Sequence, residues 1–350
     1  MPNSLIVQTS FLGDMVLTTP LIAYLAKRGP VDVVCTPAAS ALIANHPAVR
    51  EAIVYDKRGA DRGVGGMVRM AAQLRARAYD SAYFAQGSVR SGAIGALARI
   101  PDRVGFSTSA GRRFYTMRIP PVDNTHHAAR LLALGSRDPA REWSREELRP
   151  HLYPGHAERT AVDEVLGNAA YGERLIALAP GSVWATKRWP YYSELAHALS
   201  SLGRIVIVGA SGDRELATAI VGATHGQAVD ATGRLSLLAS AELIGRAALL
   251  VTNDSAPLHL GSAMNTPTLA IFGPTVPEFG FGPLADRSVV AGVDSLACRP
   301  CDRHGPQKCP LGHWRCMREI TPGALAQRAE ALVRDRNDTP DLTDLSLRDS

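Results

Sequence analysis

The chain has 350 residues, 46% of them hydrophobic and 20% charged, which is typical of a soluble globular protein long enough for two domains. A net charge of +5 suits an anionic ligand or surface, but no Lys/Arg run with interleaved aromatic residues indicates nucleic-acid binding. No apolar run approaches the ~18 residues of a membrane span, and residues 1–13 lack the pattern of a secretory signal, so we expect a cytoplasmic protein.

The first half alternates short apolar runs with helical patterns, which predicts an α/β domain whose parallel sheet is covered on both faces. The first strand leads into a glycine-containing loop, residues 9–14, and then into a helix that begins or bends at Pro20. The predicted strands are 4–8, 31–35, 52–55 and 81–85, with a helix over 67–77.

A charged, proline-containing stretch at 137–154 predicts the junction between two domains. We divide the chain into residues 1–152 and 153–336, and we expect the polar tail 337–350 to be frayed. After a helix over about 156–166, alternation resumes with strands at 175–179, 204–208, 248–252 and 268–272. The last two, with the helix between them, form a right-handed parallel crossover.

Asp14 ends the loop after the first strand, at the carboxyl edge of the first predicted sheet. A carboxylate there can accept a proton from a bound hydroxyl. The alternative is that Asp14 only complements the dipole of the helix that follows.

Three loops of the second domain follow strands at one sheet edge, where anions bind in proteins of this class. Adjacent Lys187 and Arg188 suit a diphosphate, although a solvated pair is the alternative. Asp254 and Ser255 stand at a helix N-terminus, whose N–H groups attract anions. Asp213 and Glu215 can bind ribose hydroxyls or cap a helix.

Arginine is frequent in the first domain, which predicts an anionic partner if several arginines line a cleft there. The alternative for any single arginine is a solvated surface. The candidate binding residues are Arg58, Arg62, Arg112 and Arg113.

Four of the five cysteines fall within nineteen residues, together with two histidines, His304 and His313. This set has enough soft ligands for a tetrahedral zinc, but a cysteine-rich loop without metal is the alternative. The four are Cys298, Cys301, Cys309 and Cys316.

At three places the residues resemble the signatures of glycosyltransferase family 9, the ADP-heptose:lipopolysaccharide heptosyltransferases. The resemblance spans residues 4 to about 322, in order, and the cysteine segment is similar to the heptosyltransferase II branch. One departure is Ala256, where the family usually has glycine. The matching residues are Gly13-Asp14 with Leu17 and Pro20, Pro180-Gly181 with Thr186-Lys187-Arg188-Trp189-Pro190, and Asp254-Ser255 with His259, Pro267 and Phe272-Gly273-Pro274-Thr275.

The resemblance implies a GT-B architecture with two facing Rossmann-like domains, the acceptor on the first and the nucleotide sugar on the second. It implies inverting transfer, without metal or cofactor, of L-glycero-D-manno-heptose from ADP-heptose to the heptosylated inner core of lipopolysaccharide (lipid A–Kdo–heptose). The site would lie at the cytoplasmic face of the inner membrane. By this resemblance Asp14 is the catalytic base, Lys187 binds the donor phosphates, and Asp254, Ser255 and His259 belong to the donor site. From their position in the loops at the same sheet edge, the candidate donor residues also include Ser182, Arg188, Asp213 and Glu215.

Two alternatives remain open from the residues. One is a relative that uses another nucleotide sugar or acceptor. The other is a non-catalytic protein that binds a nucleotide or zinc.

Overall fold

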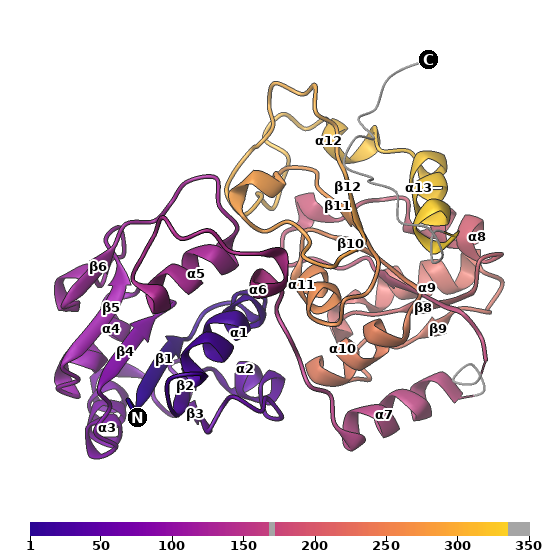
Figure 1. The fold of residues 1–350 in the computed structure, drawn as a ribbon. Helices are drawn as coiled ribbons and strands as arrows, with labels where there is room; N and C mark the ends of the chain where they lie inside the picture. The colour runs from indigo at the N-terminus through magenta and orange to yellow at the C-terminus, as the bar shows by residue number, and fades with distance from the viewer. Residues whose placement is uncertain (168–171, 335–350) are drawn as a thin grey trace. The chain divides into compact units, whose positions relative to one another are not determined.

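The computed structural model describes residues 1–167 and 172–334 (Figure 1). Its described residues form two compact units. The first contains residues 1–155 and 278–281, and the second contains residues 156–277 and 282–334. The tail predicted over 337–350 lies outside the described residues.

The sheet of the first unit has six parallel strands in the order β3-β2-β1-β4-β5-β6. Every residue of β1 and β2 is buried, as expected of central strands whose apolar runs are covered on both faces. The strands are β1 (Ser4–Gln8), β2 (Val31–Cys35), β3 (Glu51–Val54), β4 (Ser81–Phe84), β5 (Asp102–Phe106) and β6 (Met117–Ile119).

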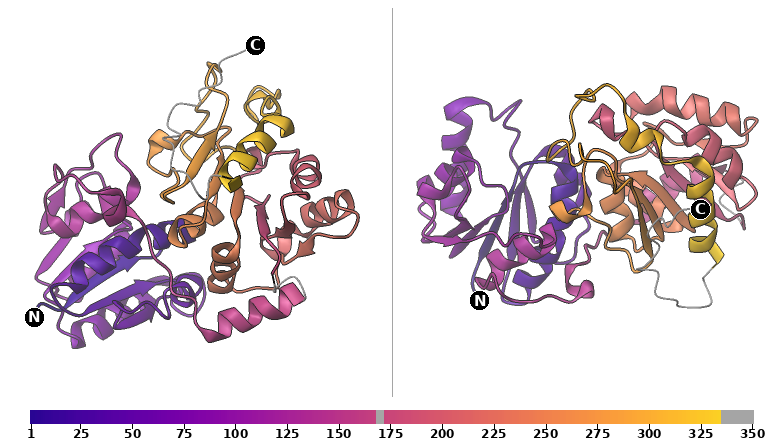
Figure 2. Two further views of the ribbon diagram at one scale, coloured as in Figure 1. Left: turned by 45° about the vertical axis from the view of Figure 1, so that its right-hand side comes forward. Right: turned by 90° about the horizontal axis from the view of Figure 1, so that it is seen from above.

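Helices cover both faces of this sheet (Figure 2). Helices α1 and α5 pack together on one face, and α3 and α4 pack together on the other, where the side chains of α3 and α4 join Leu5 and Val7 of β1 in one core. The helices are α1 (Leu12–Ala26), α2 (Pro37–Leu42), α3 (Gly63–Ala76), α4 (Val89–Leu97), η1 (Arg112–Phe114), α5 (His127–Ser136) and α6 (Arg145–Leu148).

Helix α1 begins at Leu12, eight residues before Pro20, so the loop predicted over 9–14 was wrong for its last three residues. A proline inside a helix removes the hydrogen bond to the carbonyl four residues earlier. Here that carbonyl belongs to Val16, and the Thr19 hydroxyl donates to it at 2.8 Å. A neighbouring side chain thus replaces the missing N–H, and the helix continues through the proline.

The sheet of the second unit is also parallel, with the order β12-β11-β10-β7-β8-β9. Read from the first strand of each unit, both sheets have the same Rossmann-type topology. The strands are β7 (Leu175–Ala179), β8 (Arg204–Ile207), β9 (Val229–Asp230), β10 (Leu249–Asn253), β11 (Thr268–Ile271) and β12 (Ser288–Ala291).

A buried cluster of this unit lies between its sheet and helices α8, α9 and α13. Alternate strand residues, such as Ile176 and Leu178 of β7, point into it because successive side chains of a strand face opposite ways. The helices are α7 (His156–Leu166), η3 (Ala185–Lys187), α8 (Tyr192–Leu199), η4 (Ser211–Asp213), α9 (Arg214–Ala223), α10 (Leu237–Arg246), α11 (Ala256–Ala263), η5 (Pro277–Phe279), α12 (Arg315–Arg318) and α13 (Pro322–Arg334).

Residues 278–281 belong to the first unit although the chain on either side of them belongs to the second. The His127 N–H donates to the Gly280 carbonyl at 2.7 Å, and the Arg130 guanidinium donates to the Phe279 carbonyl at 2.8 Å. Gly280 has a φ of +95°, and a Cβ atom there would lie 2.4 Å from Arg130 Nη2. This return segment therefore needs glycine at its centre.

In an open parallel sheet, ligands bind beyond the carboxyl ends of the strands, where the strand order reverses. That point lies between β1 and β4 in the first unit and between β7 and β10 in the second. No helix in the part of the chain that the structure describes is long and apolar enough to cross a bilayer.

Candidate functional site

Asp14 lies in the first turn of α1, directly beyond the carboxyl end of β1. Its Oδ2 atom is 2.8 Å from the Ser10 hydroxyl, which is also 2.7 Å from Gln8 Oε1. A hydroxyl has one hydrogen, so Ser10 donates to one of the two acceptors at a time. Asp14 is therefore oriented by a polar neighbour, and its partly buried carboxylate lies at the switch point of the first sheet.

Three cations gather at the same edge, in the loop after β3 and on α4. Lys57 donates its ammonium to the Thr9 carbonyl at 2.6 Å, which ties this loop to the loop after β1. Burial lowers the pKa of Lys57, and the nearby charges of Arg58 and Arg90 lower it further. Like charges so close together favour the binding of an anion among them.

The other predicted acceptor-binding residues are exposed and lie on elements at this edge. Arg62 is the N-cap of α3, and Arg112 and Arg113 form η1 after β5. Arg103, by contrast, donates to the carbonyls of Phe114 and Ile100 within the fold.

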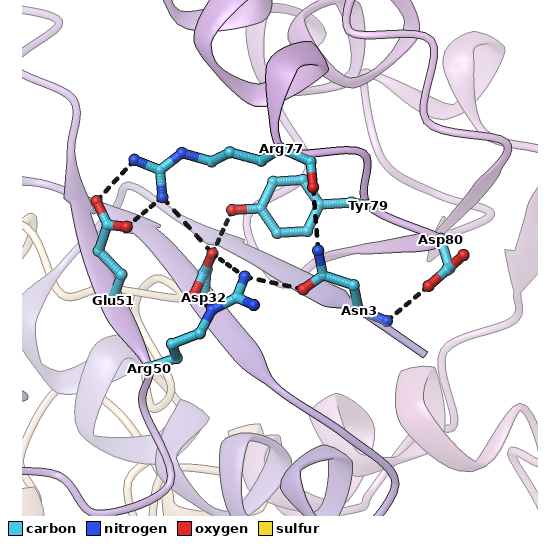
Figure 3. A network of polar contacts seen from close by, with 7 residues as sticks. All are labelled: Asn3, Asp32, Arg50, Glu51, Arg77, Tyr79 and Asp80. Carbon is cyan, nitrogen blue, oxygen red and sulfur yellow. Dashed lines mark hydrogen bonds and ion pairs between the residues drawn. The ribbon is translucent and has the colours of Figure 1, made fainter. Parts of the chain in front are cut away.

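A second charged cluster of the first unit lies at the opposite edge, around the amino ends of the strands (Figure 3). Its centre is Asp32, which is fully buried and accepts from Arg50 Nε at 2.8 Å and from the Tyr79 hydroxyl. Arg77 pairs with Glu51 and approaches Asp32. These charges satisfy one another, so we interpret the cluster as structural.

The centre of the candidate donor site is a buried ion pair that joins the loop after β7 to the end of β10. Lys187 Nζ is 2.6 Å from Asp254 Oδ2, and both side chains are only 10% exposed. The same carboxylate oxygen accepts from the Thr275 hydroxyl at 2.6 Å. An ammonium has three N–H donors, so Lys187 can hold Asp254 and still donate to a phosphate oxygen.

Other predicted donor residues surround this pair at the same edge. Arg188 is exposed and donates from Nε to the Ser182 carbonyl at 2.8 Å, while the Ser182 hydroxyl accepts from the Trp184 N–H at 3.2 Å. Ser255 precedes α11, but its hydroxyl donates to the Asn253 carbonyl at 3.4 Å rather than capping the helix. His259 is buried within α11.

Asp213 and Glu215 stand at the start of α9, after β8. Asp213 Oδ2 accepts from the Ala210 N–H at 2.9 Å at the start of η4, but as the N-cap residue of α9 Asp213 makes no side-chain cap bond. Its carboxylate also lies against Gly181, where a Cβ atom would be 2.4 Å from it. Glu215 is exposed.

The four clustered cysteines have free thiols. Burial and the neighbouring cysteines raise the pKa of Cys316 to about 11. Cys298 Sγ lies 3.8 Å from His313 Nε2. Among the described residues, no group of three or more His, Cys, Asp or Glu side chains is arranged to hold a metal ion. Zinc at this loop stays a prediction.

Two residues of these sites were missed in the sequence. Lys57 stands next to Arg58 after a strand, and this position is the signal in the sequence that would identify it. Thr275 occurs in a matching motif, but only the folded chain places its hydroxyl on Asp254.

Comparison with known proteins gives one family. The model of "Glycosyltransferase family 9 (heptosyltransferase)" matches residues 67–313. Lipooligosaccharide heptosyltransferase 2 of Haemophilus influenzae is 27% identical, over 95% of this chain and 99% of that protein. Lipopolysaccharide heptosyltransferase 1 of Pseudomonas aeruginosa is 29% identical, over 94% of this chain and 97% of that protein.

A solved structure of Escherichia coli ADP-heptose LPS heptosyltransferase II superimposes with a TM-score of 0.77 at 24% identity, over 95% of this chain and 98% of that one. This likeness, with the two parallel six-stranded sheets, confirms the predicted α/β fold of the GT-B class.

Proposed function

The chain belongs to glycosyltransferase family 9, and from that premise we propose that it transfers L-glycero-D-manno-heptose from ADP-heptose to the heptosylated inner core of lipopolysaccharide. Membership in this family favours a glycosyltransferase over the non-catalytic alternative. The finer assignment is supported by the cysteine segment, Cys298 to Met317, which resembles the heptosyltransferase II branch.

The observation that carries the proposal is the pair of polar sites at the two switch points. Asp14 follows β1 beside a group of cations, and the Lys187–Asp254 pair links β7 to β10. A carboxylate and cations suit an acceptor that offers a hydroxyl and carries acidic groups. A lysine that pairs with Asp254, just before the N-terminus of α11, suits a nucleoside diphosphate.

In the mechanism we propose, the acceptor hydroxyl attacks the anomeric carbon of heptose from the face opposite ADP. Asp14 takes the proton of that hydroxyl as the new C–O bond forms and the bond to ADP breaks, which inverts the anomeric configuration. Lys187, Arg188 and the N-terminus of α11 stabilise the charge that develops on the leaving diphosphate. In this mechanism protein cations supply the positive charge that a metal ion supplies in other transferases. The sequence has no Asp-x-Asp pair that would hold a divalent cation.

The acceptor is expected to bind through its acidic groups. Lys57 and Arg58 with Arg62, Arg112 and Arg113 lie on loops and helices at the carboxyl edge of the first sheet. Bidentate guanidinium contacts suit the carboxylates of Kdo and the phosphates of the inner core.

Since the acceptor has a lipid anchor, we place the reaction at the cytoplasmic face of the inner membrane. Val64 and Val68 lie one turn apart on α3, with 70% and 52% of their surface exposed, next to Arg62 and Arg69. An exposed apolar pair among cations favours contact with an anionic bilayer. Sedimentation with anionic vesicles should be lower for the Val64→Ser/Val68→Ser variant than for wild type, and equal sedimentation would remove this support.

The decisive experiment is a turnover assay with ADP-heptose, read by mass spectrometry. The acceptors are Kdo–lipid A with and without its first heptose. We expect addition of one heptose to the heptosylated acceptor, in the presence of EDTA, and an inverted anomeric centre by NMR. UDP- and GDP-sugars serve as donor controls.

The runner-up is transfer of the first heptose, because a heptosyltransferase 1 is as similar to this chain as a heptosyltransferase 2. Turnover only on the acceptor that lacks heptose would establish that alternative. Turnover only with another nucleotide sugar would refute the donor assignment.

A further inference from the structure

The cysteine-rich loop, residues 296–317, contacts the loop that carries Lys187, more than one hundred residues earlier in the chain. Gln307 Nε2 donates to the Val183 carbonyl at 3.0 Å, and the Ala185 N–H donates to Gln307 Oε1 at 3.2 Å. The Thr186 hydroxyl donates to the Pro306 carbonyl. We call residues 304–307 the clamp segment, because they bind the backbone of Val183 and Ala185 and the side chain of Thr186.

The clamp segment also confines the side chain of Lys187. Gly305 is buried with a φ of +83°, and a Cβ atom there would lie 3.2 Å from Lys187 Cε and 3.3 Å from Lys187 Cγ. The His304 ring stacks on Trp184 at 6.0 Å. The four-carbon stem of the lysine is thereby packed against chain rather than left to rotate in water.

The chain just before the clamp segment is anchored to the turn after β11. Arg299 donates to the carbonyls of Gly273 and Phe272 at 2.7 and 3.0 Å, and the Cys301 N–H donates to the Pro274 carbonyl at 2.9 Å. That turn carries Thr275, whose hydroxyl donates to Asp254. The contacts form a closed circuit, since Asp254 in turn accepts from Lys187.

We propose that the clamp segment is a positioning element for the donor diphosphate, with Thr186 and Gln307 as its positioning residues. Ordering a lysine side chain costs rotamer entropy when a ligand binds. Contacts that hold its loop and stem beforehand reduce that cost, so the phosphates of the donor bind more tightly. The inference rests on the proposed function, in which Lys187 meets those phosphates.

The test compares binding of ADP with binding of adenosine, which has no phosphate, by titration calorimetry. The double variant Thr186→Val/Gln307→Ala removes all three clamp hydrogen bonds and leaves Lys187 in place. We expect its Kd for ADP to rise about tenfold while its Kd for adenosine stays within about twofold of wild type. Adding Lys187→Met should weaken ADP binding no further than Lys187→Met alone, because the clamp acts through that lysine.

The matched control is Asn265→Gly, at the opposite edge of the same sheet. Asn265 also makes two side-chain hydrogen bonds, one to the Asp286 carboxylate and one from the Asp286 N–H, and its φ of +53° suits glycine. This variant should leave both Kd values unchanged. If the double variant does not fold, the two single variants test the same ratio.

An equal loss of ADP and adenosine affinity, or none for either ligand, would overturn the inference while leaving the proposed function intact. The inference would also be overturned if the effects of the double variant and of Lys187→Met on the Kd for ADP were additive. A wild-type protein that binds adenosine and ADP equally well, or neither of them, would overturn the proposed role of Lys187 and the inference together.

Discussion

Replacing Lys187 by methionine should destabilise the second unit as well as weaken donor binding. The variant keeps the stem of the side chain but leaves the buried Asp254 carboxylate without its cation. Breaking a buried pair in this way costs about 3–5 kcal/mol. Here we expect about 3 kcal/mol, because Thr275 still donates to the carboxylate and each side chain keeps some access to solvent. For a domain of this size that lowers Tm by roughly 6–12 °C.

The double-mutant cycle with Asp254→Asn separates the lost pair from lost packing. With both charges removed, no buried charge is left alone, so the double variant should recover about 2 kcal/mol relative to the sum of the single changes. The assay is urea unfolding at neutral pH, followed by ADP titration of each folded variant. Lys308→Met serves as the control, because Lys308 is an exposed lysine of the cysteine-rich loop.

Additive single effects would show that Lys187 and Asp254 do not stabilise each other. A Lys187→Met variant with unchanged stability and unchanged ADP affinity would show that Lys187 contributes to neither stability nor donor binding. ADP affinity that falls by about 1.5–3 kcal/mol is the expected result.

Three further predictions follow from single side chains. Asp14→Asn keeps an acceptor for the Ser10 hydroxyl but loses the basicity of the carboxylate. Turnover should therefore fall ~10²–10⁴-fold while ADP binding and Tm stay nearly intact. A near-normal kcat would show that another residue is the base. Burial, with a contribution from His151, lowers the pKa of His46 to about 4, so the stability it contributes is present above pH 6.5 and is lost towards pH 4, by up to about 3 kcal/mol. Urea unfolding between those pH values should show a smaller loss for His46→Asn than for wild type, and equal slopes would contradict this. Burial acts to raise the pKa of Cys309, but hydrogen bonds from the backbone of residues 311–314 outweigh it and lower the pKa, whereas burial raises the pKa of Cys35 to about 12. Iodoacetamide at neutral pH should therefore modify Cys309 well before Cys35. If Cys309 is instead protected and a chelator removes that protection, the result would support zinc binding.

The central strands could be read from the sequence because buried parallel strands are continuous apolar runs. The predicted runs 4–8, 31–35 and 175–179 coincide with β1, β2 and β7. Short or edge strands gave no such signal: β6 has three residues and β9 has two, and both were missed. Tertiary pairing, rather than local pattern, makes these segments strands.

The candidate sites were predictable to the level of the loop and no further. Parallel strands bring their carboxyl ends to one edge, so Lys187 and Asp254 could be assigned to one region of the sheet. The two residues are 67 positions apart in the sequence, and their ion pair depends on the directions of their side chains in the folded chain. No rule based on sequence spacing predicts those directions. The start of α1 was misplaced for a similar reason, since the Thr19 hydroxyl compensates for Pro20 only once the helix exists.

The return segment 278–281 has a consequence for the order in which the protein is made. Synthesis proceeds from the N-terminus at ~5–20 residues per second, and domains commonly fold as they emerge. The first unit here cannot complete the N-terminal turn of α5 in this way, because the Gly280 carbonyl that accepts from His127 leaves the ribosome only after most of the second unit. A fragment that stops at residue 155 therefore lacks part of its own fold, and we expect it to need residues 278–281, supplied in cis or as a peptide, to reach the stability it has in the whole chain.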